Sequence, residues 1–149
     1  MSLSTTESLG NQKFDLIISE RCLINLLNWP EQKKALLEIK SRLKPNGRII
    51  LCENTREGLC RLNYLRQSVD LPNIEQRWHN FYLPEKQFLA FAKKQFKLKQ
   101  SLNIGSTYYL ISRVVYARLC VLENKKLDYL HFINQIAAQL PAVGEGSPN

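Results

Sequence analysis

The sequence predicts an α/β fold in which two parallel strands flank one helix. Residues 14–19, FDLIIS, form a short apolar run typical of a strand that is buried on both faces. Residues 48–54, RIILCEN, form a second such run, and Leu36, Ile39 and Leu43 recur at helical spacing between the two. Strand, helix and strand within about 40 residues predict a right-handed, parallel βαβ unit.

The expected helix has recognisable start and stop signals. Asn28 can cap its first turn, Pro30 suits that turn, and Glu31 stands where a capping-box acid would bond back to the cap. Residues 44–47, KPNG, predict a turn after the helix, because proline cannot continue it and Asn-Gly tolerates positive φ.

Further helices are expected later in the chain. Leu59, Leu62, Leu65 and Val69 mark one helix, and Pro84 can open another in which Phe88, Phe91 and Ala92 face inward. Residues 106–120 are interpreted as a helix, although their β-branched content would also suit a strand. A last helical pattern runs from Leu127 to Leu140.

One further strand is expected at residues 96–104, FKLKQSLNI. Apolar Phe96, Leu98, Leu102 and Ile104 alternate there with polar neighbours. Alternation of this kind predicts a half-exposed strand near the edge of a sheet.

Length and composition predict one globular domain. The chain has 149 residues, of which 44% are apolar and 23% charged. We expect a leader at residues 1–13, an α/β domain at 14–140 and a loop or tail at 141–149. No apolar run approaches the ~20 residues of a membrane helix, and no secretory signal is recognisable, so the expectation is a cytoplasmic protein.

Neither the cysteines nor the charge indicates a site. Cys22, Cys52, Cys60 and Cys120 are far apart, which favours reduced structural thiols and no metal. The net charge of +8 would suit an acidic or nucleic-acid partner. The lysines occur as separated pairs on the polar faces of expected helices, and this pattern favours solvated surfaces over nucleic-acid binding.

Residues 13–54 resemble a known family. FDLIISERCLINL followed by LLEIKSRLKPNGRIIL is similar to the fourth strand, next helix and fifth strand of class I S-adenosylmethionine-dependent methyltransferases, and LKPNGRIIL is especially typical of them. The resemblance implies the second half of a Rossmann-like three-layer sheet, followed by a C-terminal helical segment. Periodicity alone would fit any parallel α/β protein.

The chain departs from that family at the cofactor. The family binds S-adenosyl-L-methionine at a glycine-rich turn between its first strand and helix, whereas the only GxG of this sequence is Gly144 to Gly146, with no strand before it. The resemblance therefore covers the substrate side, and the cofactor-binding half is missing. We expect the chain alone to bind the cofactor weakly or not at all and to be inactive.

Candidate cofactor contacts follow the first strand, because ligands of parallel sheets lie beyond the carboxyl ends of the strands. By resemblance, Ser19, Glu20, Arg21 and Cys22 would line the methionine end of the cofactor, with Arg21 pairing its carboxylate. A local ion pair between Glu20 and Arg21 is the structural alternative.

Candidate catalytic groups are Glu53, which could hold a substrate hydroxyl or amine, and His79, which could be the general base. A solvated strand end and a packed or surface histidine are the alternatives. His131 is interpreted as structural. Asn25 could instead satisfy backbone groups, and Tyr108 could belong to the core. The candidate substrate contacts are Asn25, Asn54, Trp78, Asn80, Tyr82 and Tyr108.

The function expected from the resemblance is methyl transfer to a small-molecule acceptor. The alternative is a non-catalytic Rossmann-like interaction or regulatory module. The resemblance implies that the strand at Phe14 to Ser19 lacks its first-strand neighbour and so has an open, apolar edge. We expect it to pair with a second copy of the chain, giving a dimer, or with a complementing chain.

Overall fold

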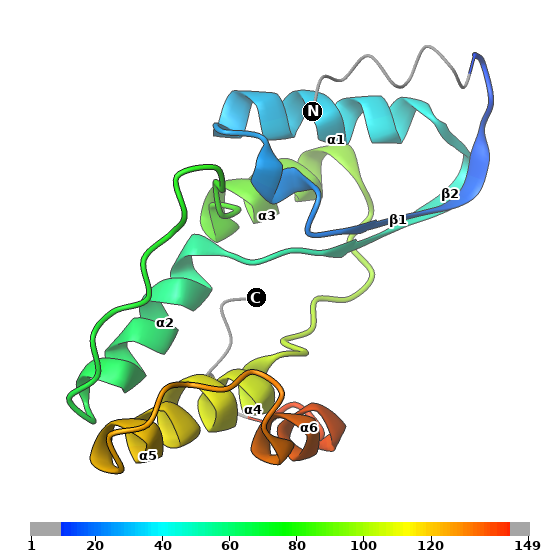
Figure 1. Ribbon diagram of the computed structural model, residues 1–149. Helices are drawn as coiled ribbons and strands as arrows, with labels where there is room; N and C mark the ends of the chain where they lie inside the picture. The colour runs from blue at the N-terminus through cyan, green and yellow to red at the C-terminus, as the bar shows by residue number, and fades with distance from the viewer. Residues whose placement is uncertain (1–9, 144–149) are drawn as a thin grey trace. The chain divides into compact units, whose positions relative to one another are not determined.

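The computed structural model describes residues 10–143, which divide into two compact units (Figure 1). Unit 1 contains the described residues up to Glu53 together with Gln76–Leu83. Unit 2 contains Asn54–Glu75 and the described residues from Pro84 onward. Most of the expected leader and of the expected tail lies outside the described residues.

Unit 1 is built on the predicted βαβ unit. Strand β1 (Phe14–Glu20) and strand β2 (Leu43–Cys52) are parallel, with helix α1 (Trp29–Ser41) between them in the chain. A short 3-10 helix, η2 (Leu23–Asn25), follows β1. The α/β class is therefore confirmed. The described residues form a sheet of only two strands, so a Rossmann-like three-layer sheet is not present in them.

Helix α1 begins where the sequence predicts. The Asn28 side chain accepts a hydrogen bond from the Glu31 backbone N–H at 2.9 Å, and its Nδ2 donates to Glu31 Oε1 at 2.9 Å. This reciprocal pair satisfies one of the free amides of the first turn. The helix buries Gln32, Ala35 and Leu36.

The KPNG segment is part of β2 and not a separate turn before it. Phe14 pairs with Leu43, but Leu16 already pairs with Arg48, so the register shifts between these two pairs. Residues 44–47 therefore stand opposite the single residue Asp15, and they bulge out of the ladder with Asn46 at a φ of 63°. Tight packing inside the bulge explains the glycine, because a Cβ on Gly47 would lie 2.9 Å from the Lys44 carbonyl oxygen and 3.0 Å from that of Phe14.

The bulge makes a testable prediction. Gly47→Ala should lower the free energy of unfolding by about 1–3 kcal/mol, because both crowded atoms belong to the backbone and cannot rotate away. Asn46→Gly, the matched control one residue away, should change it by less than about 1 kcal/mol, since glycine adopts positive φ freely. Urea denaturation measures both. Equal stability of Gly47→Ala and the wild type would contradict the described bulge.

Unit 2 is helical. Its elements are α2 (Arg56–Gln67), α3 (Glu85–Gln95), α4 (Ser106–Tyr109), the π-helix η3 (Leu110–Val115), α5 (Tyr116–Leu122) and α6 (Phe132–Gln139). The Thr55 side chain caps α2 by accepting from the Gly58 N–H at 3.0 Å. The helix expected at 106–120 is confirmed as α4, η3 and α5 in succession. Its middle turn is wider than an α-helix, which the sequence did not indicate.

Two expectations for unit 2 were wrong. Residues 97–103 form no strand, and Leu98, Leu102 and Ile104 are exposed. The only described strands belong to unit 1, and a single strand without a partner is not stable. The last helix begins at Phe132 and not near Leu127, because Asp128 Oδ1 accepts from the Leu130 N–H at 2.9 Å and holds a turn instead.

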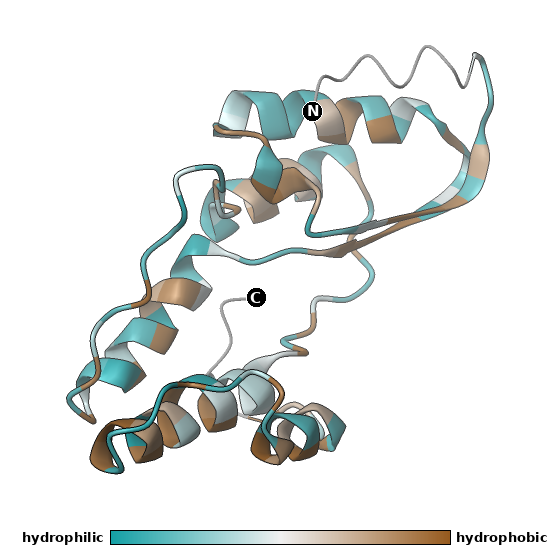
Figure 2. Ribbon diagram, viewed as in Figure 1, coloured by the Kyte–Doolittle hydropathy of each residue, from teal (hydrophilic) through white to brown (hydrophobic). Residues whose placement is uncertain are grey.

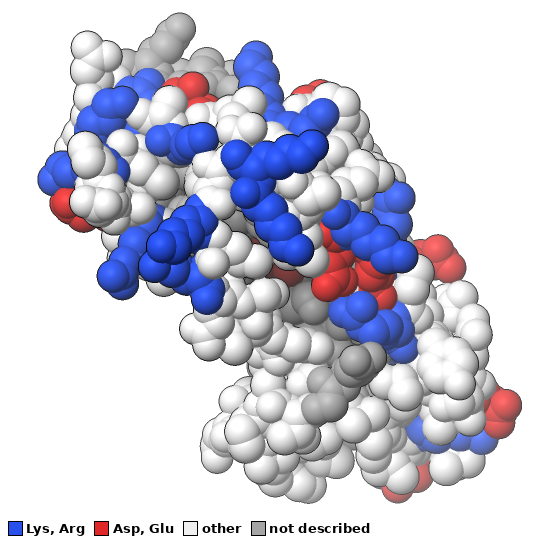
Figure 3. Space-filling model, turned by 180° about the vertical axis from the view of Figure 1, so that it is seen from behind, with Lys and Arg blue, Asp and Glu red and all other residues white. Residues whose placement is uncertain are grey.

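The surface of the molecule carries two marked features. The paired strands of unit 1 are hydrophobic where LII of β1 lies beside IIL of β2 (Figure 2), yet Leu16, Ile18 and Ile50 are exposed on one face of the sheet. Basic side chains outnumber acidic ones on the face shown in Figure 3, as the composition requires. Among the described residues, no helix has the length and apolar character needed to cross a membrane.

Candidate functional site

The candidate site is organised by Glu53, the residue that follows β2. Its side chain is 8% exposed. Oε1 accepts from the Cys22 N–H at 3.0 Å, from the Leu23 N–H at 3.0 Å and from the Ser19 hydroxyl at 3.3 Å. One carboxylate oxygen thus joins the end of β1 to the turn after it. The sequence predicted Ser19, Cys22 and Glu53 as neighbours beyond the strand ends, and the structure brings them together.

The second oxygen of this carboxylate is unusual. Oε2 of Glu53 is buried and has no hydrogen-bond partner. Burial raises the pKa of Glu53 above its ordinary value of 4.5, although the hydrogen bonds from Leu23, Cys22 and Ser19 oppose that rise. A buried acceptor without a donor costs free energy. An O–H or N–H group that donated to Oε2 would remove this cost.

The turn beside Glu53 is strained at Arg21. This residue has a φ of 51°, which is uncommon for a residue with a Cβ, and its N–H donates to the Cys52 carbonyl at 2.9 Å. Its side chain is exposed and makes no ion pair with Glu20 among the described residues. Backbone strain of this kind gathers at functional sites. Asn25 satisfies backbone groups, which was the structural alternative for this residue: its Nδ2 donates to the carbonyls of Arg21 and Cys22 at 3.1 and 3.3 Å.

Gln32 supports the same turn from α1 and was missed by the sequence reasoning. It is fully buried, and its Nε2 donates to the Leu23 carbonyl at 3.0 Å and to the Phe81 carbonyl at 2.8 Å. Its Oε1 has no partner and is the second buried acceptor of unit 1 without a donor. The sequence did contain a signal for Gln32. It lies on the same helical stripe as Leu36 and Ile39, and a polar residue is unexpected on an apolar stripe.

Segment Gln76–Leu83 lies against this turn through Phe81, whose N–H donates to the Ile24 carbonyl at 2.7 Å. The candidates Asn80 and Tyr82 flank Phe81, and within residues 10–143 their hydrogen bonds use their backbone atoms, with the Gln76 side chain and the Arg77 carbonyl as partners. Trp78 is 89% exposed, and His79 packs edge-on against it at 5.2 Å. No hydrogen bond among the described residues joins His79 to Glu53.

Two candidates belong to unit 2 and not to the Glu53 cluster. Asn54 is buried at the start of that unit. Tyr108, in α4, packs edge-on against Tyr109 with ring centroids 5.5 Å apart. The interpretation of His131 as structural holds, since its Nδ1 accepts from the Ile133 N–H at 3.3 Å and caps α6.

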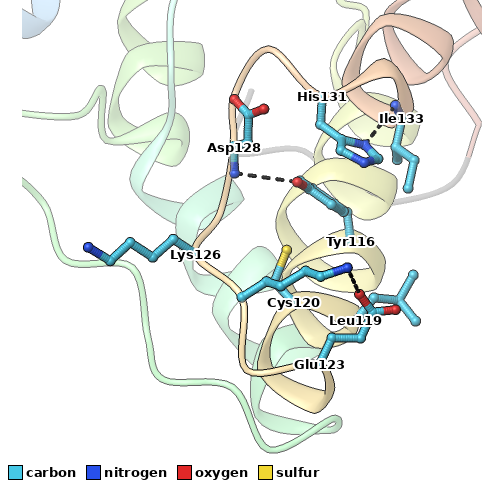
Figure 4. A pocket seen from close by; sticks show the side chains of 9 residues that line it. Tyr116, Leu119, Cys120, Glu123, Lys126, Asp128, His131 and Ile133 are labelled. Carbon is cyan, nitrogen blue, oxygen red and sulfur yellow. Dashed lines mark hydrogen bonds and ion pairs between the residues drawn. The ribbon is translucent and has the colours of Figure 1, made fainter.

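A hollow of about 420 Å³ lies in unit 2 between α5, α6 and the loop that joins them (Figure 4). The Tyr116 hydroxyl accepts from the Asp128 N–H at 3.4 Å, and the Tyr116 ring stacks on His131 at 4.6 Å. The dashed lines in Figure 4 join Tyr116 to Asp128, His131 to Ile133 and Lys125 to Glu123. These polar groups therefore have partners among the residues that line the hollow. None of these residues was predicted as a site.

Comparison with protein-family models, with curated proteins and with solved structures finds no match to this chain. The site must therefore be judged on its own residues. Among residues 10–143 no three histidine, cysteine or acidic side chains are grouped to hold a metal ion. The cysteines in this range are free thiols.

The residues present do not form a complete site for S-adenosylmethionine. The backbone N–H groups of Cys22 and Leu23, which could have bound its carboxylate, are bonded to Glu53. Of the four residues that the resemblance implies for this end of the cofactor, Arg21 has an exposed side chain with no hydrogen bond among the described residues. The sequence offers no glycine-rich turn after a strand for the nucleoside end.

The raised pKa of Glu53 predicts a pH dependence of stability. The folded chain holds this proton more tightly than the unfolded chain, so the contribution of Glu53 is fully present below about pH 4.5 and is lost as the pH rises through the folded pKa. Glu53→Gln should therefore gain stability relative to the wild type between pH 4.5 and 7.5, as measured by urea denaturation. Glu20→Gln removes an exposed carboxylate nearby and serves as the control. A difference between Glu53→Gln and wild type that is constant with pH would refute the assignment.

Proposed function

We propose that unit 1 holds the methyl acceptor of an S-adenosylmethionine-dependent methyltransferase that acts on a hydroxyl or an amine. The observation that carries the proposal is the buried Oε2 of Glu53, an acceptor without a donor at the carboxyl ends of two parallel strands. The type of reaction, methyl transfer, is inferred from the resemblance of residues 13–54 to class I methyltransferases. The strained Arg21 supports the location.

For methyl transfer, the main task of the protein would be to position the acceptor. S-adenosylmethionine would supply a methyl group from its sulfonium and leave as the neutral thioether S-adenosylhomocysteine, and the acceptor would have to lie in line with the breaking C–S bond in a site closed to water. Glu53 would accept a hydrogen bond from the acceptor O–H or N–H and so fix its orientation. A carboxylate whose pKa is raised by burial is also better suited to take up the acceptor proton. His79 remains a candidate base for a hydroxyl acceptor, from the segment that contacts the same turn.

The acceptor site can be tested without the cofactor. A panel of small alcohols and amines should shift the backbone amide signals of Cys22 and Leu23 in NMR spectra, because both N–H groups bond to the carboxylate that receives the ligand. Glu53→Gln should weaken binding of any hit about tenfold or more, whereas Glu20→Gln should not. If no alcohol or amine acts at these amides, or if Glu53→Gln binds equally well, the acceptor site is refuted.

Cofactor binding is a separate part of the proposal. Calorimetry should detect no affinity of the chain for S-adenosylmethionine tighter than about 1 mM, because one arginine is left to meet a carboxylate and most of the cofactor has no matching residues. Micromolar affinity would show that the cofactor site was judged wrongly.

A non-catalytic interaction module is the second candidate, and the open sheet favours it. Parallel strands are normally covered on both faces, yet Leu16, Ile18 and Ile50 are exposed on one face of this sheet. No third strand among the described residues pairs with β1 or β2. We propose a second copy as the partner, since β1 can pair with its own copy in antiparallel fashion about a two-fold axis.

Self-association predicts a specific mutational result. The wild-type chain should sediment as a dimer at micromolar concentration, and Ile18→Lys should shift it to monomer, because Ile18 is 63% exposed in the single chain and would be buried in the pair. Tyr64→Lys is the matched control, with a side chain 72% exposed on α2. A wild-type monomer, or a dimer that Ile18→Lys leaves intact, would contradict pairing through β1.

A further inference from the structure

Unit 2 contains two arginines that lie close together without a counterion. Arg66 extends from α2, and its Nη1 donates to the backbone carbonyl of Arg113 in η3. Burial, and after it the charge of Arg113, lowers the pKa of Arg66. Among the described residues neither guanidinium has a carboxylate within ion-pair distance.

Other arginines of the same unit differ in this respect. Arg61 pairs with Glu85 and Arg118 with Asp70, each at 3.5 Å, and the side chains of both arginines are about a third exposed. Arg66 is only 9% exposed and yet has no acid. Buried charges are normally paired, because leaving one unpaired in a low dielectric is costly.

Part of the role of Arg66 is structural. Its Nε donates to the Pro72 carbonyl at 2.8 Å, and its Nη1 satisfies a carbonyl of the π-helix. These bonds use two of its nitrogens and leave Nη2 without a partner among the described residues. Carbonyl oxygens satisfy donors but carry no full negative charge, so the two positive charges remain uncompensated.

Arg113 has a more open arrangement. Its guanidinium carbon lies 4.5 Å from the ring centroid of Tyr129 and 5.6 Å from that of Tyr108. The rings attract the cation but do not neutralise it. Its Nη1 is buried and has no hydrogen-bond partner. The wide turn of η3 carries this side chain, and single π-turns inside helices are frequent at functional sites.

We propose that Arg66 and Arg113 form a binding site for a compact oxyanion, a phosphate or carboxylate group of a ligand. The anion supplies the missing counterion for both guanidiniums and an acceptor for the buried Nη1 of Arg113. Planar guanidinium forks match the oxygens of phosphate and carboxylate. The rings of Tyr108 and Tyr129 hold the Arg113 guanidinium and so border the proposed site. This site stands independently of the proposed methyl transfer.

Calorimetry on the full chain in chloride buffer tests the proposal, with inorganic phosphate and acetate as two separate probes at matched ionic strength. We expect one of the two to bind with a dissociation constant of about 1 mM or tighter, and the probe that binds identifies the chemistry of the group. Arg113→Gln should weaken that binding at least tenfold. Arg118→Gln removes the same charge from neighbouring α5 and should leave it unchanged.

A second variant separates geometry from charge. Arg113→Lys keeps the charge and most of the stem but loses the planar fork, so it should also weaken binding several-fold. It serves as the decisive variant if Arg113→Gln does not fold. The proposal is overturned if neither probe binds, or if Arg113→Lys binds the anion as tightly as the wild type and the Arg118→Gln control do.

Discussion

Unit 1 depends on one carboxylate. Oε1 of Glu53 collects donors from Ser19, Cys22 and Leu23 and so fixes the path of the chain where β1 ends. The Gln32 Nε2 donates to the Leu23 carbonyl, and the Phe81 N–H donates to the carbonyl of Ile24, the next residue of the turn. Without the carboxylate, the N–H groups of Cys22 and Leu23 would lose their acceptor directly after Arg21, the residue with a positive φ.

Both units keep polar groups where a simple core would have apolar ones. In unit 1 these include Glu53 and Gln32, and in unit 2 they include Arg66, with the half-buried Arg113 beside it. Each residue makes structural hydrogen bonds or ring contacts, and three of them retain a buried atom without a partner: Gln32 Oε1, Glu53 Oε2 and Arg113 Nη1. Groups left in this state destabilise the chain by itself. A ligand that satisfied them would recover that free energy, and this is the physical reasoning behind both the proposed acceptor site and the proposed oxyanion site.

Local signals in the sequence were sufficient where the structure is local. Asn28 and Glu31 fixed the start of α1, and the apolar runs identified β1 and β2. The residues beyond the strand ends, Ser19, Cys22 and Glu53, followed from the geometry of parallel sheets.

The bulge at Asn46 and Gly47 was not predictable, because it depends on the register between strands. The prediction of a strand at 96–104 was wrong, because alternation of apolar and polar residues indicates an amphipathic segment but does not show whether a partner strand is present. Arg66 and Arg113 are 47 residues apart in sequence, and only the fold brings them together.

The ionisation of Glu53 tests this account most directly. Carbon-detected NMR of the Glu53 carboxylate across pH 3 to 8 gives its pKa, and the amide signals of Cys22 and Leu23 report the same event from the other side of the hydrogen bonds. The account predicts a pKa above 4.5 and one shared midpoint for the three signals. A pKa at or below 4.5, or amide signals that do not follow the carboxylate, would contradict it.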